Sequence, residues 1–194
     1  MPSLPTLRAR AGARAKAAGG AWEGFVEGQN EMAIRLGLLA CVEHTRPPMI
    51  VRGGKAIYTA ASVADYIGTL AAGTFLVDPQ HLLDRRVGSG LSLALEAKSC
   101  ADARFYRQHI SPGQQAHLAA VSRAGGLALL LVEFREEKAA LWTIRRFAGR
   151  WDALPWERAR TAETLTAAGM AAAGCELAGG CYLAKFMDTA RAGV

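Results

Sequence analysis

The sequence predicts a single α/β domain in which a mixed central β-sheet is flanked by helices. Segments with helical spacing of apolar residues, 20–39 and 111–124, alternate along the chain with short apolar runs of strand character. The 194 residues, 51% of them hydrophobic, suffice for one sizeable core and are too few for two ordinary domains. We therefore expect one domain over residues 19–194.

A flexible basic arm is expected ahead of this domain, over residues 1–18. The arm carries Arg8, Arg10, Arg14 and Lys16, and no acidic residue precedes Glu23. The formal net charge of the whole chain is +6. Such an arm suits a nucleic acid, whose backbone is a dense line of negative charge, although basic tails also bind anionic membranes or keep proteins soluble.

The N-terminal half is expected to contain one helix followed by several strands. The helix covers residues 20–39, and a short strand over 40–45 is ended by Pro47 and Pro48. Residues 46–61 contain two β segments around Gly53-Gly54, which is the pattern of a hairpin. A strand over 63–70 then carries Asp65.

The C-terminal half is expected to alternate strands and helices after a long loop over residues 71–90. Leucines alternate with smaller or polar residues over 91–99, which indicates a strand. Ser111-Pro112 is a typical helix start, and Gly125-Gly126 ends that helix. Further elements are expected as a strand over 126–134, its hairpin partner over 139–147, and a last helix starting at Pro155.

The cysteines and the hydropathy of the sequence indicate the cellular compartment in which the protein is expected. Cys41, Cys100, Cys175 and Cys181 form no CxxC pair and have no histidine partner suited to zinc, so we expect reduced thiols. No secretory signal is recognisable, and the longest apolar run, Leu127–Val132, is too short to span a bilayer. A cytoplasmic protein without a membrane partner is expected.

Asp65, Glu96 and Lys98 form the constellation that points to chemistry. Alternate residues of a strand project to the same side, so Glu96 and Lys98 enter one site together. An aspartate from a neighbouring strand gives that site two carboxylates and an ammonium. Hard cations such as Mg²⁺ prefer oxygen ligands, and lysine adds positive charge beside a reacting phosphate.

Each of these residues also has an ordinary structural interpretation. A Glu/Lys pair on one face of a strand is usually a solvated salt bridge. An aspartate three residues before Gly68 is often a turn former. The joint order of the three residues and of the elements around them favours the functional interpretation.

Five stretches of the sequence then occur in an informative order. They are GGAWEGFVEGQN (19–30), DYIG (65–68), LALEAKS (93–99), SPGQQAHL (111–118) and GGLALLLVEF (125–134). In this order they resemble RecU-type Holliday junction resolvases of the PD-(D/E)XK nuclease superfamily. The resemblance covers residues 19–147, about two thirds of the chain. It implies a restriction-endonuclease-like α/β core.

The resemblance also implies roles for particular residues. Asp65, Glu96 and the carbonyl of Ala97 would be the ligands of Mg²⁺ or Mn²⁺, and Lys98 would be the catalytic lysine. Gln114 would orient the water or the phosphate, with Gln115 leaving the register open, and Glu23 would complete the metal shell through water. The hairpin at 46–61 would be the family's DNA-binding stalk, with Arg46, Arg52, Lys55 and Tyr58 contacting the junction.

The sequence departs from the family pattern in three places. Ala64 replaces a polar residue ahead of the catalytic aspartate. Residues 71–90 lengthen the interval between Asp65 and Glu96, so that Asp84 becomes a rival metal ligand. The segment from Trp151 onward has no clear match.

The function expected from these observations is Mg²⁺- or Mn²⁺-dependent endonuclease activity on four-way DNA junctions, as part of recombination and repair. A homodimer is expected, because resolving a junction takes matched nicks in opposing strands. The alternatives are another nicking or repair nuclease on the same core, or a DNA-binding module without catalysis. An RNA-binding protein is disfavoured, because no RNP-like or GXXG signature is present.

Overall fold

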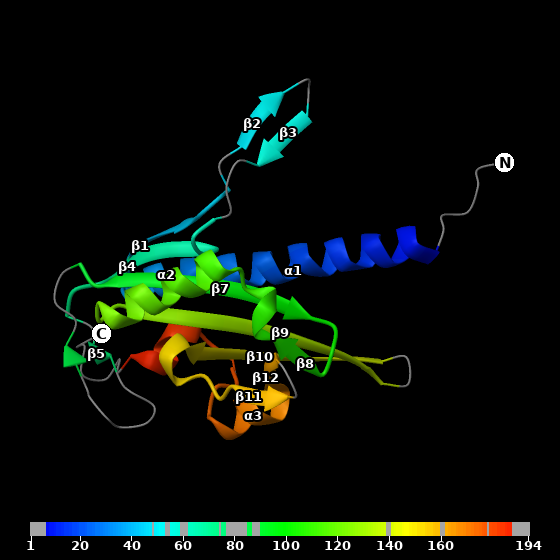
Figure 1. Cartoon of the computed structure of the whole chain (residues 1–194). Coiled ribbons are helices and arrows are strands. Elements are labelled where there is room, and N and C mark those ends of the chain that lie inside the picture. Colours follow the sequence, from blue (N-terminus) through cyan, green and yellow to red (C-terminus); the bar gives the residue numbers. More distant parts are fainter. Residues whose placement is uncertain are drawn as a thin grey trace.

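A five-stranded mixed β-sheet forms the centre of the molecule (Figure 1). The computed structural model describes residues 7–47, 49–52, 55–58, 62–73, 75–76, 85–86, 90–138, 141–159, 162–177 and 179–187. The strand order is β1-β4-β7-β9-β10. The bounds are β1 (Leu39–His44), β4 (Tyr66–Leu70), β7 (Ser92–Cys100), β9 (Leu127–Lys138) and β10 (Leu141–Arg150). The predicted mixed α/β class is confirmed.

One pair of central strands is parallel, and its connection supplies a helix. β7 and β9 run parallel, whereas β1–β4, β4–β7 and β9–β10 are antiparallel. A parallel pair needs a crossover, here through β8 (Arg104–Tyr106), η1 (Arg107–His109) and α2 (Pro112–Arg123). The Ser111 hydroxyl accepts the Gln114 N–H at 3.3 Å, and Gln114 Oε1 accepts the Ser111 N–H at 3.0 Å. This capping box confirms the predicted helix start.

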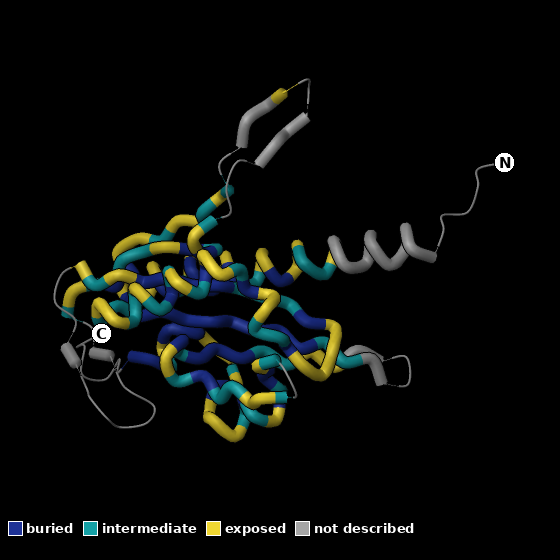
Figure 2. The backbone as a smooth tube through the Cα atoms, viewed as in Figure 1, coloured by how far each residue is buried: buried dark blue, intermediate teal, exposed yellow. Residues whose placement is uncertain are grey.

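Each face of the sheet is covered by a different set of elements. Trp22 and Val26 of α1 (Leu7–Arg35) pack with Leu93 and Leu95 in one core cluster. Leu118 of α2 packs with the intervening residues of β7 and β9 in the other cluster. Strands buried on both faces lose the polar alternation of a half-exposed sheet, as the dark central strands of Figure 2 show. Residues 93–96 are accordingly all buried, including the carboxylate of Glu96.

α1 is longer than the sequence indicated. It begins at Leu7, so residues 7–18 are helical and not the flexible arm that was expected. In Figure 1 its first turns extend beyond the sheet. Alanine and straight-chain basic residues have high helix propensity, which favours continuation of the helix into this segment. None of the described helices has the length and apolar content needed to cross a membrane.

Two small hairpins lie outside the central sheet. β2 (Met49–Arg52) and β3 (Lys55–Tyr58) pair antiparallel, which confirms the predicted hairpin, and in Figure 1 they stand apart from the sheet. Within the predicted long loop 71–90, β5 (Phe75–Leu76) pairs antiparallel with β6 (Arg85–Arg86). Asp84, the rival ligand, lies outside the described residues.

The segment after Pro155 differs from the prediction. Instead of a helix it forms β11 (Glu157–Ala159) and β12 (Ala162–Thr166), which join β8 in a three-stranded sheet. η2 (Trp151–Ala153) precedes these strands, and α3 (Ala167–Ala172) and η3 (Tyr182–Phe186) follow them. Leu165 is buried in the α2-side core and Tyr182 in the α1-side core, so packing decides this segment against its local helix-start signal.

Gly68 of the DYIG stretch is required by a close backbone approach. A Cβ at Gly68 would lie 2.5 Å from the carbonyl oxygen of Cys41 on β1. Gly68→Ala is therefore expected to destabilise the fold by about 1–3 kcal/mol, the usual cost of overpacking. Urea unfolding measures this change.

The matched control for Gly68→Ala is Gly28→Ala in α1. A Cβ at Gly28 would meet no atom within 4 Å. Because alanine favours a helix over glycine, this control should stabilise the protein by about 0.5–1 kcal/mol. A Gly68→Ala protein as stable as the wild type would show that β1 can move away from β4 at no cost.

Candidate active site

Asp65, Glu96 and Lys98 meet at one end of the central sheet. Asp65 immediately precedes β4, and Glu96 and Lys98 lie two residues apart on β7. The Lys98 ammonium lies 3.4 Å from Asp65 Oδ2 and forms a close ion pair with Glu96 Oε1. Both carboxylates thus converge on a single positive charge.

Backbone contacts on both sides fix the position of Asp65. Its N–H donates to the Leu95 carbonyl at 3.1 Å, and its carbonyl accepts the Thr45 N–H at 2.8 Å. Its side chain then continues the ladder, because Oδ2 accepts the Ala97 N–H at 3.0 Å. Asp65 is therefore held against β7 at the point where β4 begins.

The Ala97 carbonyl is the third oxygen of the site. In a strand, the N–H and C=O of one residue point toward the same neighbouring strand. The Ala97 N–H points to Asp65, so its carbonyl also faces the side of β7 on which Asp65 lies. This backbone geometry agrees with the ligand role that the family resemblance implies for Ala97.

Burial makes the carboxylate of Glu96 difficult to ionise. Its side chain is fully buried, and burial together with the charge of Asp65 raises the pKa of Glu96 to about 7, against the opposing effect of Lys98. Among the described residues, neither Glu96 oxygen accepts a hydrogen bond of good geometry. The ionised carboxylate therefore depends on a nearby cation.

Lys98 responds to the same surroundings in the opposite sense. Burial disfavours its charged form, but Asp65 and Glu96 outweigh burial and raise the pKa of Lys98 above its ordinary value. Lys98 is therefore a permanent positive charge at physiological pH.

The site opens into a cavity of about 350 Å³. Lys98 and Asp65 lie on its wall, whereas Glu96 is not among the lining residues. The lining residues are Gly19, Trp22, Glu23, His44, Asp65, Tyr66, Ala97, Lys98, Ser99 and Arg135. An extended anionic ligand can thus approach the lysine and the exposed part of Asp65.

A histidine and a tyrosine form one wall of this cavity. His44 on β1 and Tyr66 on β4 are cross-strand partners, and their rings stack with centroids 4.6 Å apart. His44 Nδ1 lies 3.5 Å from Glu27 Oε1. Burial, and then the charges of Glu27, Glu23 and Asp65, raise the pKa of Tyr66 to about 12. Tyr66 therefore stays neutral and offers an aromatic surface.

Of the two residues that were expected to assist the metal site, Glu23 lies at the cavity and Gln114 does not. Glu23 lines the cavity from α1. Gln114 does not line it, because its side chain caps its own helix. The neighbouring Gln115 is also engaged, accepting from Arg107 Nε at 3.0 Å and donating to the Ile110 carbonyl at 2.8 Å. Their catalytic roles stay predictions.

The expected DNA-contacting residues lie on and beside the β2–β3 hairpin. Arg46 and Arg52 are exposed. Lys55 and Tyr58 open and close β3, and their side chains lie outside the described residues. Arg52, the last residue of β2, and Lys55, the first of β3, are partners in the register of the hairpin.

Sequence reasoning missed His44, Tyr66, Ser99 and Arg135 as residues of the cavity. A signal existed for Arg135, because Glu133 and Arg135 alternate with Phe134 directly after the apolar run Leu127–Val132 of β9. Nothing local marks Tyr66, whose place depends on the register of β1 against β4.

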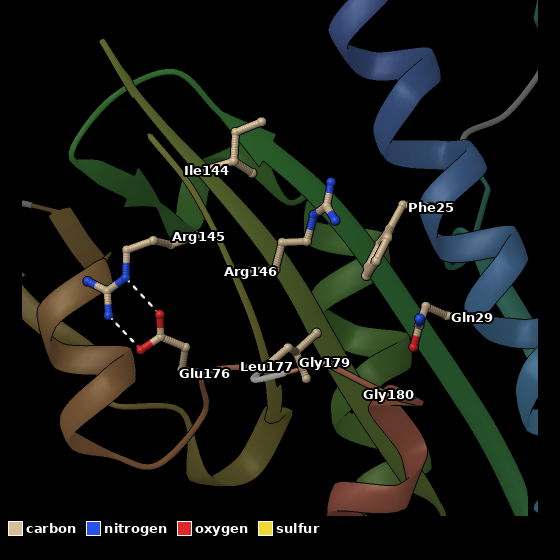
Figure 3. A pocket seen from close by; sticks show the side chains of 9 residues that line it. All are labelled: Phe25, Gln29, Ile144, Arg145, Arg146, Glu176, Leu177, Gly179 and Gly180. Carbon is tan, nitrogen blue, oxygen red and sulfur yellow. Dashed lines mark hydrogen bonds and ion pairs between the residues drawn. The ribbon is translucent and has the colours of Figure 1, made fainter. Parts of the chain in front are cut away.

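A second cavity, of about 490 Å³, lies between α1, β10 and the C-terminal segment (Figure 3). Among its described lining residues the acidic one is Glu176, which is held by Arg145 through two hydrogen bonds of 2.8 and 2.6 Å. Because that acid is already paired, the described lining of this cavity holds no pair of converging carboxylates like Asp65 and Glu96.

The donor atoms around Asp65 fit a hard divalent cation. In the part of the chain that the structure describes, no three His, Cys, Asp or Glu side chains gather to hold a metal ion. Two carboxylates and a carbonyl, all oxygen donors, are nevertheless suited to Mg²⁺, which usually keeps several waters and takes only one or two carboxylates. The buried oxygens of Glu96, which pair with Lys98 but accept no hydrogen bond of good geometry from the described residues, agree with this use.

Known proteins show only a distant likeness to this chain. No family model and no curated protein matches the chain. Among solved structures, the chain is similar to Hjc from Archaeoglobus fulgidus, a Holliday junction resolvase from an archaeal hyperthermophile. The identity is 12%, the match covers 82% of this chain and 90% of that chain, and the TM-score is 0.41.

Proposed function

We propose that this chain is a metal-dependent endonuclease that hydrolyses phosphodiester bonds in DNA. The observation that carries the proposal is the convergence of Asp65 and Glu96 on Lys98 beside an open cavity. An ordinary ion pair on a solvated surface needs no buried partner and no third charged residue. Here a carboxylate is buried at a cost in free energy, which is typical of functional sites.

Each residue of the site has a role in this proposal. Asp65, Glu96 and the Ala97 carbonyl hold Mg²⁺ or Mn²⁺. The cation, when bound, supplies charge stabilisation at the phosphate and acidifies a water molecule. Lys98 places its ammonium beside the phosphoryl oxygens, where negative charge increases in the transition state. Glu23, at the rim of the cavity, adds a further acceptor for water.

The proposed substrate is a four-way DNA junction, cut by a homodimer. Two features support this substrate: a hairpin that stands apart from the sheet with Arg52 exposed on it, and a net charge of +6. Basic residues on a projecting hairpin can contact phosphates at the branch point. The resemblance of five sequence stretches to RecU-type resolvases supports the same choice.

Two rival functions remain distinguishable from this one. Another nicking or repair nuclease would use the same site on duplex DNA. A DNA-binding module without catalysis would gain nothing from Asp65 on the wall of the cavity and a second carboxylate beside it, because carboxylates repel DNA. The buried Glu96 therefore favours an enzyme over a binding module.

The direct test is cleavage of three labelled substrates with Mg²⁺ or EDTA. A four-way junction should be nicked symmetrically with Mg²⁺, a matched duplex and a single strand should stay intact, and EDTA should stop the reaction. Equal cleavage of all three substrates would leave a general nuclease. Tight binding without cleavage under any divalent cation would leave the binding module.

The hairpin should contribute electrostatically to junction binding. Replacing Arg52 and Lys55 together by alanine is expected to weaken binding and to lower the slope of log K against log salt by up to about 1.8, since each phosphate contact contributes about 0.9. Fluorescence anisotropy over a range of salt concentrations measures the slope.

The matched control for the hairpin variant replaces Arg123 and Arg158 by alanine. Both are exposed and lie on the body of the protein. This control removes the same charge away from the hairpin and should change the slope much less. Equal effects of the two double variants would show that the hairpin contributes only to the overall charge.

A further inference from the structure

Arg135 on β9 carries a positive charge that the protein does not fully satisfy. It lines the cavity of the candidate active site, and its side chain is only 16% exposed. In the described part of the chain, its Nε is buried and donates no hydrogen bond. Nε lies 3.7 Å from Glu133 Oε1, which makes an ion pair but is beyond hydrogen-bond distance.

Glu133 is already used by other partners. Its carboxylate is almost fully buried, Oε2 accepts from Arg146 Nε at 3.0 Å, and Oε1 accepts from the Ser99 hydroxyl at 3.2 Å. The Arg146 guanidinium also lies 3.9 Å from the ring centroid of Phe25, beside which it is seen in Figure 3. One carboxylate thus fixes Arg146 and leaves Arg135 short of an acceptor.

The strand register places Arg135 beyond the reacting centre. Lys98 pairs with Val132 and Ser99 with Glu133, so Arg135 lies three residues further along β9 than the level of Lys98. At about 3.3 Å per residue, this offset is about 10 Å along the strand. The backbone of Arg135 is therefore displaced along the sheet from that of Lys98, and lies where β9 continues beyond the end of β7.

We propose that Arg135 forms a binding subsite for a DNA phosphate that neighbours the scissile phosphate, a subsite that rests on the proposed nuclease function. The guanidinium offers several donors in a planar fork that matches two phosphate oxygens. Its stem is held by the sheet and its Nε lacks an acceptor. Arg135 is thus a positioning residue that sets the DNA strand relative to Asp65 and Lys98.

Binding and cleavage by Arg135→Gln and Arg135→Lys test the subsite. Arg135→Gln should weaken DNA binding in EDTA about 10-fold at 0.1 M salt and lower the salt slope by about 0.9, the value for one phosphate contact. Single-turnover cleavage at saturating DNA should also fall, because the bound strand is then less well positioned relative to Asp65 and Lys98. Arg135→Lys keeps the charge but loses the fork, so its DNA affinity should lie between those of the wild type and Arg135→Gln.

Two controls keep this test sharp. Arg123→Gln removes one exposed charge on α2 and should change binding by less than about 2-fold. Thermal unfolding of Arg135→Gln should match that of the wild type. If Arg135→Gln folds poorly, the binding data of the folded Arg135→Lys protein decide whether the subsite exists. Wild-type affinity in both Arg135 variants, with an unchanged salt slope, would overturn the subsite.

The phosphate itself can be identified with methylphosphonate substitutions, each of which removes one backbone charge. One substitution should weaken wild-type binding as much as Arg135→Gln does, and should weaken the Arg135→Gln protein no further. Fully additive losses at every position would overturn the contact. The binding measurements need no cleavage. A wild-type protein that cuts nothing would therefore overturn the nuclease proposal, whereas the binding data alone would still decide whether Arg135 contacts a phosphate.

Discussion

Asp65→Asn is expected to lower single-turnover cleavage on the order of 10³-fold, while binding to the junction in EDTA stays at least as tight as that of the wild type. Asp65 supplies one of the two converging carboxylates, and its Oδ2 already accepts the Ala97 N–H. Asparagine can keep an acceptor in that place, so the fold should persist. It cannot keep the negative charge that a cation requires and that DNA phosphates oppose.

The comparison that gives this result meaning is Asp84→Asn. Asp84 was the rival metal ligand in the sequence, and its replacement should leave both cleavage and binding unchanged. Lys98→Ala should also lose cleavage, but metal binding should survive because lysine is not a ligand. All three variants are measured at one salt concentration, since DNA affinity depends on salt. An inactive Asp84→Asn protein beside an active Asp65→Asn protein would place the metal site in residues 71–90.

The central part of the site could be predicted because its geometry is local. Alternation along one strand is enough to bring Glu96 and Lys98 together, and the Ser111 cap is a local signal for α2. Asp65 could be named only from the order of the motifs. Its contact with Ala97 depends on the β4–β7 register, which no local pattern specifies.

The remainder could not be predicted because it depends on long-range packing. Pro155 is a good local start signal for a helix, yet β12 after it pairs with β8, about 60 residues earlier in the sequence. The cavity wall has the same origin, because His44 meets Tyr66 only when β1 and β4 pair. Arg135 becomes notable only once Glu133 is seen to be occupied by Arg146.

Glu96→Gln is expected to make the metal-free protein more stable at pH 8 and to leave its stability at pH 5 almost unchanged. The pKa of Glu96 is raised from 4.5 to about 7, chiefly by burial. Between those values the folded state binds a proton that the unfolded state releases. The stability that Glu96 contributes is therefore complete below pH 4.5 and is lost as the pH rises through about 7.

Glutamine does not titrate, so the variant escapes this loss, and Lys98 still has Asp65 as a partner. Since one pKa unit corresponds to about 1.4 kcal/mol, the gain at pH 8 has an upper limit on the order of 3 kcal/mol. Urea unfolding in EDTA at pH 5 and pH 8 measures it, with Glu31→Gln, an exposed residue of α1, as the control that should show no such difference. Mg²⁺ should reduce the difference in stability between Glu96→Gln and the wild type, because it binds the native carboxylates and so stabilises only the wild type. A Glu96→Gln protein less stable than the wild type at pH 8 would mean that the ion pair with Lys98 outweighs the cost of burying the charge, and that Glu96 is retained for structure and not for a cation.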